Sequence, residues 1–108
     1  KRSAALLSRG VSFNKFTGNR GKGGSNDANA EYIGKIRKVF DDANVAYQFA
    51  ELGKVDAGGG GTIALLVARM DVDVVDLGVP ILSMHAPFEL ASKLDVYNTY
   101  KAFCAFYK

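Results

Sequence analysis

Four consecutive glycines, Gly58–Gly61, lead directly into an almost wholly apolar segment, Thr62–Met70. Glycine loses more backbone entropy on folding than any other residue, so a run of four indicates that another chain segment or a ligand approaches the backbone closely. Tight packing of a helix on a strand and contact with a ligand explain the run equally well. The apolar segment has almost no polar face, which predicts a helix buried on most sides.

Strand and helix patterns alternate along the rest of the chain. Alternating or β-branched apolar residues predict strands over 11–16, 45–50 and 72–77, with a short extended piece over 81–84. Apolar stripes predict helices over about 28–43, over 62–70 and from Asp95 to the end. This order predicts an α/β fold, a layered α/β/α sandwich with a largely parallel central sheet.

The two longer helices are each predicted to bury one face. Asn26 or Asp27 caps the first, which buries the stripe Ile33, Ile36, Phe40 and Ala43. The last helix, capped by Asp95, is predicted to bury Val96, Tyr100, Phe103 and Tyr107, with Cys104 filling the core beside them. Its outward face is then Asn98, Lys101 and Ala105.

The charge and cysteine content exclude several classes of protein. The net charge is +3, and residues 1–40 carry nine Lys or Arg against two acidic residues. These charges are dispersed and lack an aromatic stacking platform, so we expect no nucleic-acid partner. No apolar run reaches the roughly 18 residues that a membrane helix needs, so we expect no membrane partner either. The single cysteine excludes an internal disulfide and cysteine-rich zinc modules, which fits a cytoplasmic protein.

The glycine-rich segment Gly18–Ser25 joins the first strand to the first helix, and its Arg20 and Lys22 could bind an anion together with backbone N–H groups. It is not a Walker A loop, because Phe16 and Gly23 stand where that motif needs glycine and a hydroxyl. From the residues alone, an ordinary flexible connection is the favoured explanation of this segment. An anion- or nucleotide-binding α/β module is therefore the alternative function, and a scaffold whose basic half docks a partner is a third.

The only histidine, His85, follows a short apolar strand, and Glu89 could orient its ring. A lone histidine is more often structural than catalytic, and one imidazole cannot make a zinc site, which needs at least three protein ligands. Asp71 and Asp73 flank the start of a strand and resemble solvated termini. Ser83, two residues before His85, leaves a hydrolase-like pair open.

Several ordered motifs together resemble one family. They are Gly53–Ala64, Val75–Pro80, Leu82–Glu89, Asp95–Tyr97 and, earlier, Arg20–Gly21 with Ser25–Glu31. Across almost its whole length the chain resembles the C-terminal part of the zinc metallo-aminopeptidases of the aspartyl aminopeptidase and vacuolar aminopeptidase I family, in its bacterial branch.

The resemblance implies an exopeptidase with two zinc ions, which cobalt or manganese can replace, releasing N-terminal residues from peptides within a homo-oligomer, usually a dodecamer. It implies that His85 is the last metal ligand. The residues expected at the substrate cleft are Gly58, Gly59, Gly60, Gly61, Thr62, Arg20, Ser25 and Asn26. The other metal ligands and the glutamate general base precede the matched stretch, so no catalytic base is expected among these residues.

Residues 1–108 are accordingly expected to be the C-terminal portion of the catalytic domain, without the rest of that domain or its inserted dimerisation domain. Such a portion alone should not catalyse. Two departures from the family pattern stand out: Ala86 replaces the usual serine after the histidine, and Asn14 replaces a lysine that could receive an acidic substrate side chain. The second departure favours a broader or neutral substrate preference.

Overall fold

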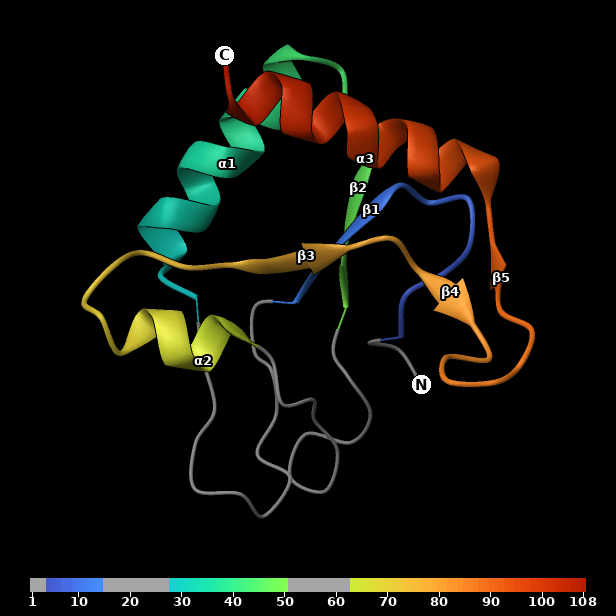
Figure 1. Ribbon diagram of the computed structural model, residues 1–108. Helices are drawn as coiled ribbons and strands as arrows, with labels where there is room; N and C mark the ends of the chain where they lie inside the picture. Colours follow the sequence, from blue (N-terminus) through green and yellow to red (C-terminus); the bar gives the residue numbers. More distant parts are fainter. Residues whose placement is uncertain (1–3, 15–27, 51–62) are drawn as a thin grey trace.

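The computed structural model describes residues 4–14, 28–50 and 63–108. Their elements, in chain order, are β1 (Val11–Asn14), α1 (Ala30–Asp42), β2 (Tyr47–Ala50), α2 (Ile63–Ala68), β3 (Asp76–Gly78), β4 (Ile81–Leu82), β5 (Leu90–Ala91) and α3 (Lys93–Phe106) (Figure 1). The predicted α/β class is confirmed. None of the described helices is long and apolar enough to cross a membrane.

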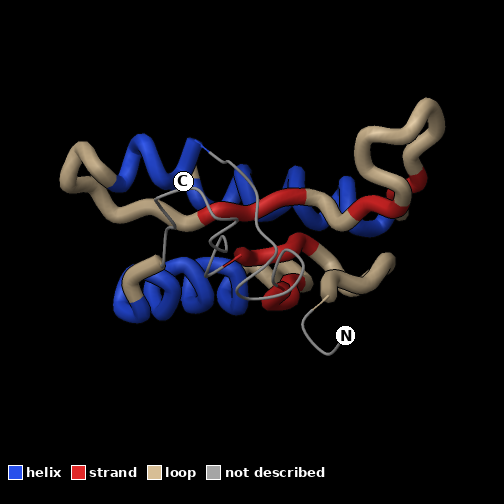
Figure 2. The backbone as a smooth tube through the Cα atoms, turned by 90° about the horizontal axis from the view of Figure 1, so that it is seen from below, coloured by secondary structure: helices blue, strands red, loops and turns tan. Residues whose placement is uncertain are grey.

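The main sheet is mixed rather than largely parallel. Its strand order is β2-β1-β3, and β1 pairs in parallel with β2 but antiparallel with β3. The parallel pair follows from the crossover through α1, whereas β3 joins the free edge of β1 from the opposite direction. β4 and β5 form a separate antiparallel hairpin, whose connecting loop projects from one end of the molecule in both Figure 1 and Figure 2.

The core lies between α1, α3 and β1 of the main sheet. The helix buries Ile33, Ile36 and Phe40, as its apolar stripe predicts. The ring of Phe13 on β1 is fully buried and lies 5.4 Å from the ring of Phe40. The cap of α1 is Asn29, not Asn26 or Asp27, since its side-chain oxygen accepts a 2.8 Å hydrogen bond from the backbone N–H of Glu31.

The buried face predicted for α3 is wrong. The helix packs against α1 and β1 with Asp95, Asn98 and Ala102 inward. Val96, Tyr100, Phe103 and Tyr107 are exposed, and so is Cys104, which the sequence placed in the core.

Backbone groups explain why the inward face of α3 is polar. The carboxylate of Asp95, wholly buried, accepts 2.8 Å hydrogen bonds from the backbone N–H groups of Ser8 and Gly10. The side-chain oxygen of Asn98 accepts a 3.0 Å bond from the N–H of Ala46. Backbone N–H groups that are shielded from water need acceptors, and these three are buried or partly buried. The polar side chains of α3 therefore face the segments that lead into β1 and β2. Asp95 therefore does not cap its own helix: the N-cap is Ser92.

The entry to β1 depends on a glycine. Gly10 has φ +92°, and a Cβ built on it would overlap the backbone carbonyl of Ala46. Only glycine satisfies both demands. The Gly10 carbonyl also accepts a 3.2 Å hydrogen bond from the Gln48 side chain, which ties this segment to β2.

Two further predictions are corrected by the structure. The helix expected to be buried on most sides, α2, exposes Ile63 (74%) and Leu66 (61%), because no other described element covers those side chains. The strand expected over 72–77 is shorter, since only Asp76–Gly78 pairs with β1. The hairpin strand β5 was not predicted, because two residues carry no readable periodicity.

Candidate metal centre

The loop between β4 and β5 has an unusual backbone. Ser83 and His85 both adopt left-handed conformations, with φ 59° and 69°. A 3.0 Å hydrogen bond from the N–H of Ala86 to the carbonyl of Ser83 closes a tight turn around them. Non-glycine residues rarely adopt positive φ, and such strain is found often at functional sites. Ser8, Asn44 and Asp71 also have positive φ, but among the described residues only this loop holds two such residues within three positions. This conformation was not predictable from the residue types, because neither residue is a glycine.

Glu89 holds the strained residue in place. Its side-chain Oε1 accepts a 2.7 Å hydrogen bond from the backbone N–H of His85. Hydrogen bonds to a carboxylate are short and stronger than those between neutral groups. The sequence suggested that Glu89 orients the imidazole ring of His85. In the structure the two residues do interact, but Glu89 binds the backbone N–H of His85 and not its ring.

The His85 side chain is exposed, and no described residue forms a hydrogen bond with its ring. Within 4–14, 28–50 and 63–108, no three His, Cys, Asp or Glu side chains lie together in a way that could hold a metal ion. Asp71 and Asp73 are exposed, as predicted for solvated termini. The described part of the chain therefore offers a single imidazole, and any complete metal site needs donors from elsewhere.

Asp76 lies apart from the hairpin, on β3. It stands opposite Asn14 in the antiparallel register and is half-buried. Burial raises the pKa of its carboxyl group, while a hydrogen bond from the Asn14 side chain acts against that rise. It lines a cavity of about 280 Å³ whose other lining residues are largely apolar and come from α1, β3, α3 and adjacent positions.

The remaining predicted site residues lie outside the described residues, so the structure does not test them. They are Arg20, Ser25, Asn26, Gly58, Gly59, Gly60, Gly61 and Thr62.

Comparison with known proteins identifies the family. Residues 1–107 match the family model described as "Aminopeptidase I zinc metalloprotease (M18)". This chain belongs to the M18 family. A "Probable M18 family aminopeptidase 1" of Clostridium acetobutylicum is 53% identical over 106 residues, which are 98% of this chain and 23% of that protein. Its counterpart in Thermotoga maritima is 50% identical, over 94% of this chain and 22% of its own length.

Solved M18 structures have the same fold in this region. The crystal structure of aminopeptidase I from Clostridium acetobutylicum superposes with a TM-score of 0.90 at 51% identity, covering 98% of this chain and 23% of that one. The M18 enzyme of Thermotoga maritima gives 0.88 at 48% identity, covering 96% and 23%. The chain thus spans less than a quarter of the length of the M18 proteins it matches.

Proposed function

We propose that this chain is the C-terminal portion of the catalytic domain of an M18 aminopeptidase, which releases N-terminal amino acids from peptides at a dinuclear zinc site. The observation that carries the proposal is the strained loop that presents His85, in a chain that matches a zinc metalloprotease family from residue 1 to 107. The relatives are about four times longer, which leaves room for the other ligands and the general base.

His85 is proposed as one zinc ligand. A neutral imidazole is a common zinc donor, and an exposed ring without a hydrogen-bond partner among the described residues is free to coordinate. The other ligands must come from residues outside the described ranges. When bound, zinc lowers the pKa of a coordinated water and polarises the scissile carbonyl.

Glu89 is proposed as a positioning residue. Its carboxylate fixes the backbone of His85, and the backbone determines where the imidazole points. A loop without this bond would sample the more favourable negative φ at His85 and carry the ring away from its place. Glu89 would thus affect the reaction indirectly, by positioning His85.

The remaining assignments rest on the family resemblance. Gly58–Gly61 and Thr62, with Arg20, Ser25 and Asn26, would border the substrate cleft. Two zinc ions, replaceable by cobalt or manganese, a cytoplasmic homo-oligomer and a complete α/β/α sandwich belong to the same proposal. The anion-binding alternative is not favoured, because the family match includes the loop on which it depends.

Replacing the proposed ligand in the full-length enzyme tests this function. In His85→Ala we expect zinc content, measured by elemental analysis, to fall below that of the unaltered enzyme, and kcat to fall at least about a hundredfold. Met84→Ala is the matched control, because it truncates an exposed neighbour in the same loop. Unchanged zinc content and turnover in His85→Ala would rule out the ligand role.

Glu89 variants separate positioning from folding. Glu89→Ala should weaken zinc binding in a chelator competition by about ten- to a hundredfold. Glu89→Gln keeps a side-chain oxygen that can accept the His85 N–H, so it should restore most of the affinity. Equal losses in both variants would contradict a role that depends on this acceptor.

A further inference from the structure

The hairpin that presents His85 is not held by packing among the described residues. The side chains of residues 82–91 are all exposed there. Its strands, β4 and β5, pair with each other, and the loop between them projects from one end of the molecule (Figure 1). The place of the hairpin therefore depends on the two segments that join it to the rest of the described structure, one from β3 and one into α3.

The segment into α3 is fixed by a buried carboxylate. Ser92 follows the hairpin and is the N-cap of α3, and its carbonyl accepts a 3.1 Å hydrogen bond from the N–H of Asp95. The Asp95 side chain accepts hydrogen bonds from the N–H groups of Ser8 and Gly10, each at 2.8 Å. The hydroxyl groups of Ser8 and Ser92 lie 2.9 Å apart. We name these four residues the Asp95 clamp.

The Asp95 clamp connects the hairpin to the main sheet. Gly10 precedes β1, and the next N–H along the chain, that of Val11, donates a 3.1 Å hydrogen bond to the carbonyl of Ala46 before β2. The N–H of Ala46 donates a 3.0 Å hydrogen bond to Asn98 of α3. The first two turns of α3, which follow the hairpin directly, are therefore bonded to the starts of both β1 and β2.

The strands β1 and β2 lead into the segments that hold the other predicted site residues. They are parallel, with Asn14 opposite Ala50, so both strands end at the same edge of the sheet. Residues 15–27 follow β1 and residues 51–62 follow β2, and these two ranges contain all of the predicted substrate-cleft residues. The Asp95 clamp thus joins the proposed zinc ligand to the strands from which the proposed cleft segments begin.

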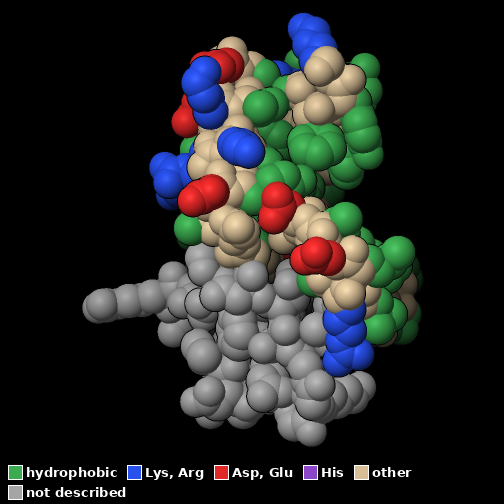
Figure 3. Space-filling view, turned by 90° about the vertical axis from the view of Figure 1, so that its left-hand side faces the viewer, with side chains coloured by type: hydrophobic (Ala, Val, Ile, Leu, Met, Phe, Trp, Pro, Cys, Tyr) green, Lys and Arg blue, Asp and Glu red, His purple; other side chains and the backbone are tan. Residues whose placement is uncertain are grey.

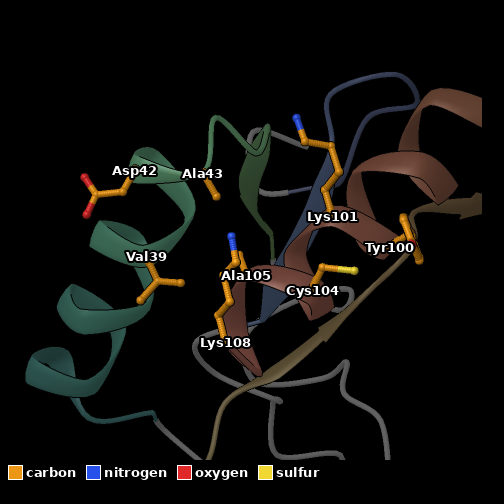
Figure 4. Close-up of a pocket in the computed structure, with 8 residues that line it drawn as sticks. All are labelled: Val39, Asp42, Ala43, Tyr100, Lys101, Cys104, Ala105 and Lys108. Atoms are coloured by element: carbon orange, nitrogen blue, oxygen red, sulfur yellow. The ribbon is translucent and has the colours of Figure 1, made fainter.

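Packing holds α3 only in part. A groove of about 470 Å³ lies between its second half and α1, and Figure 4 shows Val39 of α1 across from Ala105 of α3. Lys101, which also lines the groove, donates a 2.9 Å hydrogen bond to the carbonyl of Asn44. Hydrogen bonds from polar side chains of α3 to backbone groups therefore contribute to the placement of the helix, and those of Asp95 are among the least accessible to water.

We propose that Asp95 is a positioning residue for the zinc site. By tying the start of α3 to the start of β1, it determines where the hairpin holds His85 relative to the segments predicted to border the substrate. The inference rests on the proposed function, because it takes His85 as a zinc ligand. Asp95 acts through the hairpin and contacts neither zinc nor substrate.

The chemistry of the Asp95 clamp suits an anchor. A carboxylate accepts shorter and stronger hydrogen bonds than a neutral group, and breaking either bond would leave a shielded N–H group without an acceptor. Asp95 is wholly buried, so water does not replace these bonds. Zinc ligands must lie within about 0.2 Å of their ideal distance, so even a small shift of the hairpin lowers metal affinity.

The zinc affinity of the full-length enzyme tests this role. Asp95→Asn keeps one acceptor oxygen, so it should weaken the clamp without destroying it. We expect the dissociation constant for zinc, measured by chelator competition, to rise about tenfold. If His85→Ala loses zinc while Asp95→Asn keeps the affinity of the unaltered enzyme, the proposed function stands and the role of Asp95 is overturned. If His85→Ala keeps its zinc, both are overturned.

A variant of α1 controls for a general loss of stability. Phe40→Leu disturbs the core but leaves the bonds of the Asp95 clamp in place. α1 and the hairpin lie at opposite ends of the molecule in Figure 1, and Phe40 is buried, so the charged surface on the side that Figure 3 shows is also unchanged. At a temperature where both variants are folded, Phe40→Leu should bind zinc as the unaltered enzyme does. Equal losses of affinity in the two variants would overturn the positioning role.

Hydrogen exchange in the metal-free enzyme gives a readout that does not depend on zinc. In Asp95→Asn the backbone amides of residues 82–91 should exchange several-fold faster than in Phe40→Leu, because the exit of the hairpin is no longer fixed. Equal exchange in the two variants would show that other contacts of the full-length enzyme hold the hairpin, and it would overturn the inference.

Discussion

The helices α1 and α3 pack against each other and contribute to the same core, yet they bury opposite kinds of side chain. α1 buries Ile33, Ile36 and Phe40 and turns its charged residues outward. α3 buries a carboxylate and an amide and turns its aromatic residues outward. The amphipathic pattern of a helix therefore identifies its buried face only when all of its neighbours are known. Among the described residues, α1 finds neighbours for its apolar face, whereas the apolar side chains of α3 stay exposed.

The largest expected loss of stability comes from truncating an apolar residue that α1 buries. Phe40→Ala removes the largest side chain that α1 buries and leaves a cavity beside Phe13. We expect the free energy of unfolding, measured by chemical denaturation, to fall by about 3–5 kcal/mol. Phe40→Leu should cost clearly less, because it fills most of the cavity. A loss below about 1 kcal/mol for Phe40→Ala would show that α1 does not anchor the core.

The polar side of the comparison is tested at Asp95. Asp95→Ala removes the acceptor of two backbone N–H groups, that of Gly10 in a buried place and that of Ser8 in a partly buried one. Each hydrogen bond to a charged group contributes about 1.5–3 kcal/mol, so we expect a loss of roughly 3 kcal/mol in denaturant titrations. Asp95→Asn retains one acceptor oxygen and should lose about half as much. Stability unchanged by Asp95→Ala would mean that α3 is held by its apolar residues after all.

Removing the N-cap side chain should lower the free energy of unfolding by a smaller amount, and by more for α1 than for α3. Asn29 accepts a side-chain cap hydrogen bond at the start of α1, whereas Ser92 at the start of α3 makes none to its own helix. Asn29→Ala should therefore cost about 1 kcal/mol in thermal unfolding experiments. Ser92→Ala should cost less, because among residues 4–14, 28–50 and 63–108 the Ser92 hydroxyl contacts just that of Ser8, at 2.9 Å and exposed to solvent. Equal costs would show that the caps do not distinguish the helices.

The smallest expected effect depends on pH, at Asp76 on β3 near both helices. Burial raises the pKa of this carboxyl group in the folded state above its unfolded value, so ionisation destabilises the fold. The stabilising contribution is present below the unfolded pKa and is lost as pH rises through the folded pKa. Asp76→Asn should thus raise Tm near neutral pH, with the gain vanishing in acid. A gain that persists in acid would exclude charge burial as its cause.

The elements themselves were largely predictable from the sequence. α1 was found because its stripe packs against strands of the same chain. The buried face of α3 was not, since Asp95 at a helix start looks like a local cap, and its true partners lie more than eighty residues away. Periodicity counts apolar side chains and takes no account of backbone N–H groups that need an acceptor.

The place of His85 after a short strand was predictable from the sequence, but the conformation of its backbone was not. The single histidine after a short strand indicated where to look, and the structure places it in the hairpin loop. The left-handed backbone of His85 and its bond to Glu89 could not be predicted, because both depend on the three-dimensional path of the loop. The other predicted site residues lie within 15–27 and 51–62, and their roles remain predictions.

The bonds of Asp95 also constrain the order in which this chain can fold. Ser8 and Gly10 precede Asp95 by 87 and 85 positions, and their N–H groups enter the first strand of the sheet. A ribosome would have made β1, α1 and β2 long before it reached the carboxylate that completes their surroundings. The entropy of closing so long a loop opposes the contact until α3 is in place. During translation the start of β1 would therefore lack its hydrogen-bond acceptor until α3, the last described helix, has been made.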